Sequence, residues 1–382
     1  MKNFKLFYYL MAFTFILSAC ADDDDSPVMQ IKFVETDYTD TYNLQVGDTL
    51  QLNPALENNT SSTRYAWYLN DQIIGEKQAL SYVMNELGTY EVLFKATKGL
   101  DEITRTYTVI VADTYNKFFR PKTENSSPYI SKVLLYNPAP GQFMNTGVAS
   151  LEAAEGIVGG NTGLLSLGAW GGYVEFTFDH TIENQTSARD FVIFSNAFNG
   201  SSEPGIVQVS FDENGNGIAD DTWYEIAGDA HYEATTIRDY EITYYNPHDT
   251  TGIPFKDNQG NVDTLRTNTY HKQPYYPEFI NDQDSVTFKG TKVNAPFYKN
   301  EKGWVVSDNL AYGYVDNYSN EFSNLRGNTI DISWAVDENL EPVKLKGIDF
   351  VRVYTGSFDQ SDILGEMSTE VAGAADLSIL SK

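Results

Sequence analysis

Segments in which apolar and polar side chains alternate recur along most of the chain, and they constrain its fold more than any other feature. Residues 173–178 alternate in this way, and residues 205–210 and 348–354 are rich in β-branched and aromatic side chains. A period of two places successive side chains on opposite faces of a β-strand. No long span shows the period of an amphipathic helix. We therefore expect an all-β protein.

The length of 382 residues suits two folded domains. Residues 30–112 contain alternating segments separated by turn residues, with the spacing of an immunoglobulin-like sandwich. Residues 113–127 are polar and include a proline, so we expect a linker there. Residues 128–382 have strands near both ends and loop-rich sequence between them. This pattern predicts a larger jelly-roll-like β-sandwich with long loop insertions.

The N-terminus has the features of a lipoprotein signal. Lys2 and Lys5 precede an apolar run over residues 6–17, and small residues then lead to Cys20. Such a run is too short to span a bilayer comfortably. Because Cys20 is the only cysteine of the chain, it has no disulfide partner within the chain, and lipidation explains its presence. We expect residues 1–19 to be removed; the alternative is an ordinary secretion signal with a chance cysteine.

Residues 20–29 form an acidic tether, with four consecutive aspartates at positions 22 to 25. A run of like charges is normally solvated. Directly after a lipidated cysteine, it also resembles the export signal that sends Bacteroidetes lipoproteins to the outer face of the outer membrane. We therefore expect a lipid-anchored protein of the outer membrane that faces the cell exterior.

The charge balance excludes one class of partner. The formal net charge is −27 and the pI is about 4.3. Because nucleic-acid binding requires a cationic surface, a nucleic-acid partner is excluded. An acidic chain instead favours cations such as Ca²⁺, or neutral ligands.

One loop has the oxygen spacing of a calcium site. Residues 212–220 place side-chain oxygens at positions 1, 3, 5 and 9, a glycine at 6 and a backbone carbonyl at 7, the order in which an EF-hand-type loop binds Ca²⁺. Position 12 is Trp223, where an EF-hand requires Glu, so the pattern is that of the shorter calcium loops of secreted proteins. We expect a structural calcium ion; a metal-free turn is the alternative. The expected ligands are Asp212, Asn214, Asn216, Ile218 and Asp220.

The catalytic motifs of common hydrolases and nucleotide-binding enzymes do not occur in the sequence, and we expect a protein that is not an enzyme. The histidines are not spaced as metal pairs, so we expect them in loops or on the surface: His180, His231, His248 and His271. A glycoside hydrolase would need two facing carboxylates. Glu203 and Glu225 are the candidates for such a pair, with solvated surface positions as the alternative.

The expected insertion over residues 230–325 is rich in tyrosine set among Asn, Gln and Pro. Aromatic side chains with a polar tip suit a recognition surface, because they lose little entropy on binding. The alternative is that they pack the loops against the sandwich. The candidate ligand-binding residues are Tyr244, Tyr245, His248, His271, Tyr275, Tyr276, Trp304, Tyr312, Tyr314 and Tyr318.

Residues 30–112 resemble the PKD-like family. A tryptophan, Trp67, occupies a central strand, and a Gly-Thr-Tyr-Glu-Val segment over residues 88–92 precedes a second alternating strand. Domains of this kind usually act as spacers. We expect Trp67 to lie in the core, as the tryptophan of such sandwiches does.

The second domain also has a familiar set of segments: residues 167–173, 194–198, 202–205, 212–225, 270–277, 313–317 and 364–370. Together they resemble a family of Bacteroidetes cell-surface proteins that joins a PKD-like domain to such a C-terminal domain. The layout resembles the cobalamin-binding BtuH-type surface lipoproteins. Residues 362–365, Asp-Ile-Leu-Gly, depart from an aromatic-containing Gly-Trp-Leu-Gly segment of those relatives.

The resemblance implies capture of a corrinoid, cobalamin, which is then passed to a TonB-dependent outer-membrane transporter. Tyrosines with Asn and Gln match an apolar macrocycle fringed by amides, and cobalamin would be a ligand rather than a cofactor. Two alternatives remain. The first is a carbohydrate-binding surface lipoprotein, since sandwiches with calcium and exposed aromatic residues commonly bind glycans. The second is an extracellular glycoside hydrolase.

Overall fold

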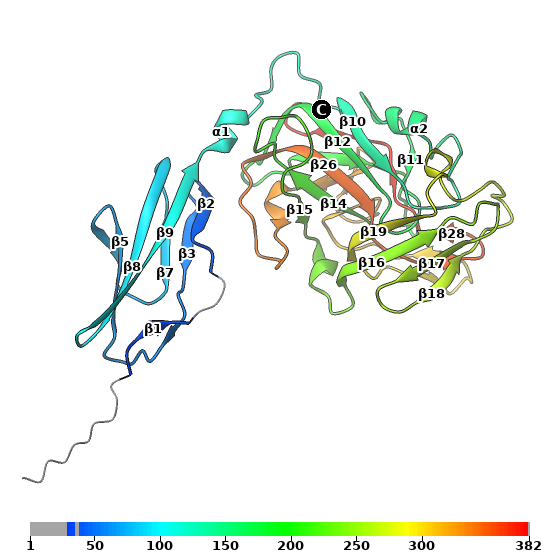
Figure 1. Ribbon diagram of the computed structural model, residues 1–382. Helices are drawn as coiled ribbons and strands as arrows, with labels where there is room; N and C mark the ends of the chain where they lie inside the picture. The colour runs from blue at the N-terminus through cyan, green and yellow to red at the C-terminus, as the bar shows by residue number, and fades with distance from the viewer. Residues whose placement is uncertain (1–28, 35–37, 381–382) are drawn as a thin grey trace, which may run out of the picture. The chain divides into compact units, whose positions relative to one another are not determined.

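The computed structural model describes residues 29–34 and 38–380, and the chain divides into two compact units, residues 1–113 and 114–382 (Figure 1). Cys20 and the acidic tether lie outside the described residues, so lipidation stays a prediction. In the described part of the chain, no helix has both the length and the apolar character to cross a membrane. The expectation of an all-β protein is confirmed, because the α-helices among the described residues are only five residues long.

The N-terminal unit is a small β-sandwich. Its main sheet has the order β2-β9-β8-β5-β6, and β3 pairs with β7 in a second sheet. The main-sheet strands are β2 (Thr41–Gln45), β5 (Arg64–Leu69), β6 (Gln72–Gly75), β8 (Gly88–Lys98) and β9 (Asp101–Ala112). The others are β1 (Lys32–Phe33), β3 (Thr49–Leu52), β4 (Leu56–Glu57) and β7 (Leu80–Val83), and β1 pairs with β4.

Trp67 of β5 is the centre of the N-terminal core. Its side chain is fully buried, packs on the ring of Phe94 with centroids 4.6 Å apart, and donates from Nε1 to the carbonyl of Lys77. Strand alternation places Trp67 on the inner face of the sheet, so the prediction of a core tryptophan is confirmed.

Replacing Trp67 by alanine is expected to destabilise the N-terminal unit by about 3–5 kcal/mol, because it leaves a large cavity and an unpaired carbonyl. Denaturant unfolding of that unit measures the loss. Leu100, which is fully exposed at the β8–β9 turn, supplies the control: Leu100→Ala should change the unfolding free energy by less than about 0.5 kcal/mol. Equal effects of the two substitutions would contradict the assignment of Trp67 to the core.

The C-terminal unit is built on a sandwich of two sheets. The larger sheet has the order β10-β12-β26-β14-β15-β25, with β22 also paired to β14, and the smaller has the order β23-β24-β13-β30. The larger comprises β10 (Lys132–Asn137), β12 (Tyr173–Glu183), β14 (Gly205–Ser210), β15 (Tyr224–Ile226), β22 (Tyr314–Val315), β25 (Ala335–Val336) and β26 (Gly347–Thr355). The smaller comprises β13 (Phe191–Phe194), β23 (Phe322–Ser323), β24 (Gly327–Ile330) and β30 (Gly373–Asp376).

Apolar side chains from both sheets form one core. Phe176, Val207 and Val351 come from the larger sheet, while Ile193 and Ile330 come from the smaller, and all five are fully buried. The sequence predicted strands over residues 173–178, 205–210 and 348–354, and the structure confirms them as parts of β12, β14 and β26. Residues 329–334 also alternate in the sequence, which predicts a strand, but this prediction is wrong in its second half, where the chain forms the 3₁₀-helix η3 (Ile332–Trp334).

The predicted insertion is an ordered layer rather than a set of loops. It contains a four-stranded sheet, β18-β17-β16-β19, made of β16 (Ile237–Tyr245), β17 (Ile253–Asp257), β18 (Val262–Leu265) and β19 (Ser285–Lys292) (Figure 1). Short elements complete the unit: α1 (Thr114–Phe118), α2 (Leu151–Glu155), η1 (Asp229–Tyr232), η2 (Glu278–Ile280), β11 (Leu165–Ser166), β20 (Phe297–Lys299), β21 (Val305–Ser307), β27 (Gln360–Ser361), β28 (Gly365–Glu366) and β29 (Glu370–Val371).

Trp170 joins this insertion sheet to the sandwich. Its indole is buried, donates to the carbonyl of Gly356 at 3.2 Å, and lies edge-on to Tyr240 with centroids 4.6 Å apart. Gly171 has a positive φ of 90°, and a Cβ there would lie 2.4 Å from Cβ of Phe288. Only glycine therefore lets the two layers approach this closely.

The segment expected to be a linker, residues 113–127, contacts the C-terminal unit through Arg120. The guanidinium of Arg120 pairs with the buried carboxylate of Asp349 at 2.9 Å and donates to the carbonyl of Phe178. The backbone carbonyl of Arg120 also accepts from the amide of Thr181. This segment is therefore fixed to the C-terminal unit by polar contacts that its composition did not reveal.

Candidate functional site

A hollow of about 400 Å³ opens in the C-terminal unit where the sandwich meets the insertion sheet. The sandwich contributes β14, β15 and β25, and the insertion sheet contributes β16 and β19. We call it the Trp223 hollow. Its lining residues are Gln208, Trp223, Glu225, Arg238, Asp239, Gly290, Thr291, Val336, Asp337, Glu338 and Asn339.

Glu225 supplies a fixed carboxylate to the wall of this hollow. Its two oxygens accept hydrogen bonds from the hydroxyls of Tyr354 and Thr291, each at 2.7 Å, and from the amide of Gln208 at 3.3 Å. Burial alone would raise the pKa of Glu225, but the contacts with His231, Tyr354 and Thr291 outweigh it and lower that pKa. Glu225 is therefore ionised at neutral pH.

His231 orients the same carboxylate from behind. Nδ1 of His231 accepts from the amide of Gly228 at 3.1 Å, so Nε2 carries the proton and faces Glu225 at 3.4 Å. The histidine is buried, as is His180, which sits between the carboxylates of Asp179 and Asp376. The expectation of surface positions is wrong for these two histidines, because each is held by polar partners from distant segments.

Trp223 gives the hollow an aromatic wall. The guanidinium of Arg352 lies 4.2 Å from the centre of the Trp223 ring, close enough for a cation–π contact. Arg352 is itself held by Glu175 at 2.6 Å and by Gln208 at 2.8 Å. The indole is therefore fixed before any ligand arrives.

Arg238 contributes an unpaired hydrogen-bond donor to the lining of the hollow. Its Nε is buried and has no hydrogen-bond partner among the described residues. An unpaired buried donor is costly, so its presence in a hollow points to a ligand acceptor or to water. Arg238 could not be recognised from the sequence, since an isolated arginine in an expected insertion resembles any solvated charge.

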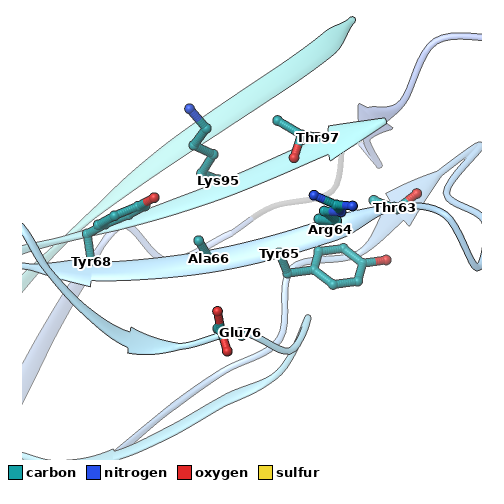
Figure 2. A pocket seen from close by; sticks show the side chains of 8 residues that line it. All are labelled: Thr63, Arg64, Tyr65, Ala66, Tyr68, Glu76, Lys95 and Thr97. Carbon is teal, nitrogen blue, oxygen red and sulfur yellow. The ribbon is translucent and has the colours of Figure 1, made fainter. Parts of the chain in front are cut away.

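The N-terminal unit has a second hollow of about 400 Å³ on its main sheet (Figure 2). Figure 2 shows Lys95 and Thr97 on one strand and Arg64, Ala66 and Tyr68 on the next. Lys95 also pairs with Glu102 at 2.6 Å. The full lining is Thr63, Arg64, Tyr65, Ala66, Tyr68, Glu76, Lys95 and Thr97.

Four of the expected ligand-binding tyrosines are core residues: Tyr244, Tyr275, Tyr276 and Tyr314. The Tyr244 hydroxyl donates to the carbonyl of Trp170, and that of Tyr314 lies 2.7 Å from Nδ1 of His231. The expectation that these tyrosines face a ligand is therefore corrected. They belong to strands and turns whose buried face packs on the sandwich, the alternative that the sequence left open.

The other six candidates keep some exposure, and none of them lines the Trp223 hollow. Trp304 is 67% exposed, while Tyr245 and Tyr318 are each less than half exposed. Their role in ligand binding stays a prediction. Of the rest, Tyr312 packs on Trp334, His271 packs on Phe143, and His248 lies 3.5 Å from Asp284.

Glu203 and Glu225 do not form a facing pair. Glu225 lines the Trp223 hollow, whereas Glu203 lies beside Asp316 and Glu370. An acid catalyst must also hold a proton at neutral pH, and the lowered pKa of Glu225 opposes this. The geometry gives no support to a glycoside hydrolase built on these two residues.

The structure brings the expected calcium ligands together in the loop between β14 and β15. Asp212 accepts from the amides of Gly215 and Gly217, and Asp220 accepts from the side chains of Asn214 and Asn216. The carbonyl of Ile218 accepts from the amide of Asp220. Burial and then the charges of Asp212 and Asp220 raise the pKa of Asp221, which has a buried oxygen without a partner. Calcium binding by this loop stays a prediction.

Residues 30–98 match the PKD-like domain family. The N-terminal unit is a PKD-like domain. This agrees with the resemblance seen in the sequence, although the match covers this domain alone. No curated protein matches the chain.

Three solved structures show weak similarity. They are a SusE-like protein (8% identity, TM-score 0.25, covering 91% of this chain and 96% of the other), a carbohydrate-binding module of the β-sandwich superfamily (10%, 0.19, 92% and 99%), and a Bacteroides ovatus protein of a mixed-linkage glucan utilisation locus, solved with a heptasaccharide (9%, 0.20, 73% and 66%). At these TM-scores we infer nothing about the C-terminal unit or the PKD-like domain from the similarity.

Calcium binding by the loop is tested with Asp220→Asn, which keeps the size of the side chain but removes a charged ligand. The full chain should lose one bound calcium ion, measured by elemental analysis after dialysis in calcium-buffered solution. Asp282→Asn, at an exposed site away from the loop, should keep the full count. An unchanged count in Asp220→Asn would show that the loop is a metal-free turn.

The lowered pKa of Glu225 predicts a pH-dependent contribution to stability. The contribution is present above the unfolded-state pKa of about 4.3 and is lost as pH falls through the lower folded-state pKa. Glu225→Gln should lower the unfolding free energy at pH 7 by about 1.5–3 kcal/mol. The difference from the unaltered protein should shrink in denaturant titrations below about pH 4. The exposed Glu241→Gln serves as control, and a pH-independent difference would contradict the account.

Proposed function

We propose that this protein is a lipid-anchored protein of the outer cell surface that binds a carbohydrate in the Trp223 hollow and does not transform it. The observation that carries the proposal is the combination of groups in that hollow. One wall is a fixed aromatic ring, another is the ionised carboxylate of Glu225, and Arg238 supplies an unpaired donor.

These groups match the chemistry of a sugar. A pyranose presents a C–H face that packs on an aromatic ring, and hydroxyls that donate to a carboxylate while accepting from a guanidinium. A volume of about 400 Å³ lies within the range of small-molecule sites. Because a cation–π contact holds Trp223 and hydrogen bonds hold Glu225, little conformational entropy is lost when a ligand binds.

The absence of a proton on Glu225 supports binding rather than hydrolysis. Because Glu225 is ionised, it does not supply the protonated acid that glycoside hydrolysis requires; the other carboxylates that line the hollow are Asp239, Asp337 and Glu338. In this proposal, acylated Cys20 holds the protein at the membrane. The bound sugar then passes to an outer-membrane transporter of the TonB-dependent class.

Corrinoid capture is the second candidate. Four of the tyrosines that suited a macrocycle are buried, and the Trp223 hollow is small for a corrinoid. Six exposed or partly exposed candidates, Trp304 among them, remain available to such a ligand. The residue requirements separate the two ligands, because sugar binding needs Trp223 whereas corrinoid binding does not.

A glycan array followed by calorimetry with the best oligosaccharide tests the proposal. Trp223→Ala and Arg238→Met should each weaken sugar binding at least about tenfold, a loss of about 1.4 kcal/mol. Trp304→Ala, which removes an exposed tryptophan outside the hollow, should leave sugar affinity unchanged.

Cyanocobalamin is tested in parallel by desalting and by red absorbance that co-elutes with the protein. Cobalamin binding without glycan binding would replace carbohydrate by corrinoid. Release of reducing sugar by the purified protein would contradict non-enzymatic binding. Equal loss of glycan binding in Trp304→Ala and Trp223→Ala would move the site away from the Trp223 hollow.

A further inference from the structure

Three segments meet inside the C-terminal unit, away from the Trp223 hollow. They are residues 202–205, 313–317 and 364–370, which also carry the family resemblance. Strands β14 and β22 bring the first two together through the pairing of Gly205 with Val315. A Cβ on Gly205 would lie 2.6 Å from the methyl of Thr369, so glycine permits the third segment to approach. The segments are thus packed to close contact at this point.

Each segment contributes one carboxylate to the meeting point. One carboxylate oxygen from each of Glu203, Asp316 and Glu370 lies within 4.8 Å of the other two. Backbone contacts fix the arrangement: the amide of Glu370 donates to Oδ2 of Asp316 at 2.9 Å, and the amide of Glu203 donates to the carbonyl of Asp316 at 2.9 Å. We call these three residues the carboxylate triad.

The carboxylate triad is largely shielded from water. Asp316 is 1% exposed and Glu370 is 4% exposed, whereas Glu203 is partly exposed. Oδ1 of Asp316 and Oε1 of Glu370 are buried and have no hydrogen-bond partner among the described residues. The hydroxyl of Ser195 is also buried beside Asp316. Several oxygens therefore remain available around one point.

No side-chain cation compensates this charge. Within the described part of the chain, none of the triad carboxylates forms an ion pair with Lys, Arg or His. Neighbouring buried carboxylates repel one another when they are ionised, and a cation bound between them would remove that repulsion.

We propose that Glu203, Asp316 and Glu370 bind a calcium ion inside the C-terminal unit. Ca²⁺ prefers carboxylate, carbonyl and hydroxyl oxygens and accepts irregular geometry, which suits three carboxylates from three segments. Mg²⁺ demands near-ideal octahedral geometry and keeps its waters, so it fits this dry site less well. The partly exposed side of Glu203 gives the ion a route from solvent. This site is distinct from the loop at residues 212–220.

The ion would act as a structural crosslink. It would tie β14, β22 and β29 at one point, and it would be lost on unfolding, when its ligands separate. A ligand that binds only the folded state raises the unfolding temperature. Unlike the calcium loop, whose ligands are local in sequence, this site depends on three segments that lie far apart in the sequence.

The experiment counts calcium in the full chain, purified in mild detergent and dialysed against calcium-buffered solution. Glu370→Gln and Glu203→Gln should each bind one calcium ion fewer than the unaltered protein and should lose the calcium-dependent rise in unfolding temperature that this site supplies. Glu366→Gln is the matched control, since Glu366 is equally buried but lies outside the carboxylate triad. It should keep the full count.

Two further results distinguish loss of the calcium site from misfolding of the variants. In chelator, Glu370→Gln should unfold at or above the temperature of the unaltered protein, because a neutral amide removes repulsion. The chain with Asp220→Asn, whose triad is intact, should still bind one calcium ion. A calcium-free Asp220→Asn chain would overturn the proposal, and so would unchanged counts in both triad variants.

Discussion

The packing of the insertion sheet against the sandwich is the interaction on which the candidate site depends. Trp170 stands at that junction, with its indole bonded to Gly356 and its carbonyl accepting from Tyr244. The Trp223 hollow lies between the same two layers, because Glu225 lies on β15 and Trp223 directly precedes that strand, while β16 and β19 supply Arg238 and Thr291. Many of the chain's aromatic residues therefore hold the two layers together and so position the polar hollow, rather than contact a ligand.

Glu225 and Glu370 of the C-terminal unit have different surroundings, which suit different ligands. Glu225 receives hydrogen bonds from hydroxyl and amide groups and lies beside the imidazole of His231, so it stays charged. Glu370 lies against two other carboxylates and keeps an unpartnered oxygen. The first arrangement suits a ligand with hydroxyl donors, and the second suits a metal ion. The acidic residues of this chain, whose net charge is −27, thus have at least two different environments that suit different ligands.

Alternation was enough to predict the all-β class, most of the large strands and the core position of Trp67, because period two and burial are local properties. The PKD-like domain was recognisable from residues 88–92 and Trp67. The Trp223 hollow was not, since Arg238 and Thr291 reach it through sheet pairing that local sequence does not specify. Tyr244 and Tyr314 misled for the related reason that a tyrosine in a polar segment can still point inward. Asp212 and Asp220 were found because their spacing is itself local.

The central claim is that the ligand binds in the Trp223 hollow, and the indole N–H of Trp223 reports such binding directly. The chain has five tryptophans, so a ¹⁵N spectrum resolves five indole N–H signals. Titration with a binding oligosaccharide should shift the Trp223 signal strongly and leave those of the buried Trp67 and Trp170 in place. A saturable shift confined to Trp304, with the Trp223 signal unmoved, would contradict the central claim.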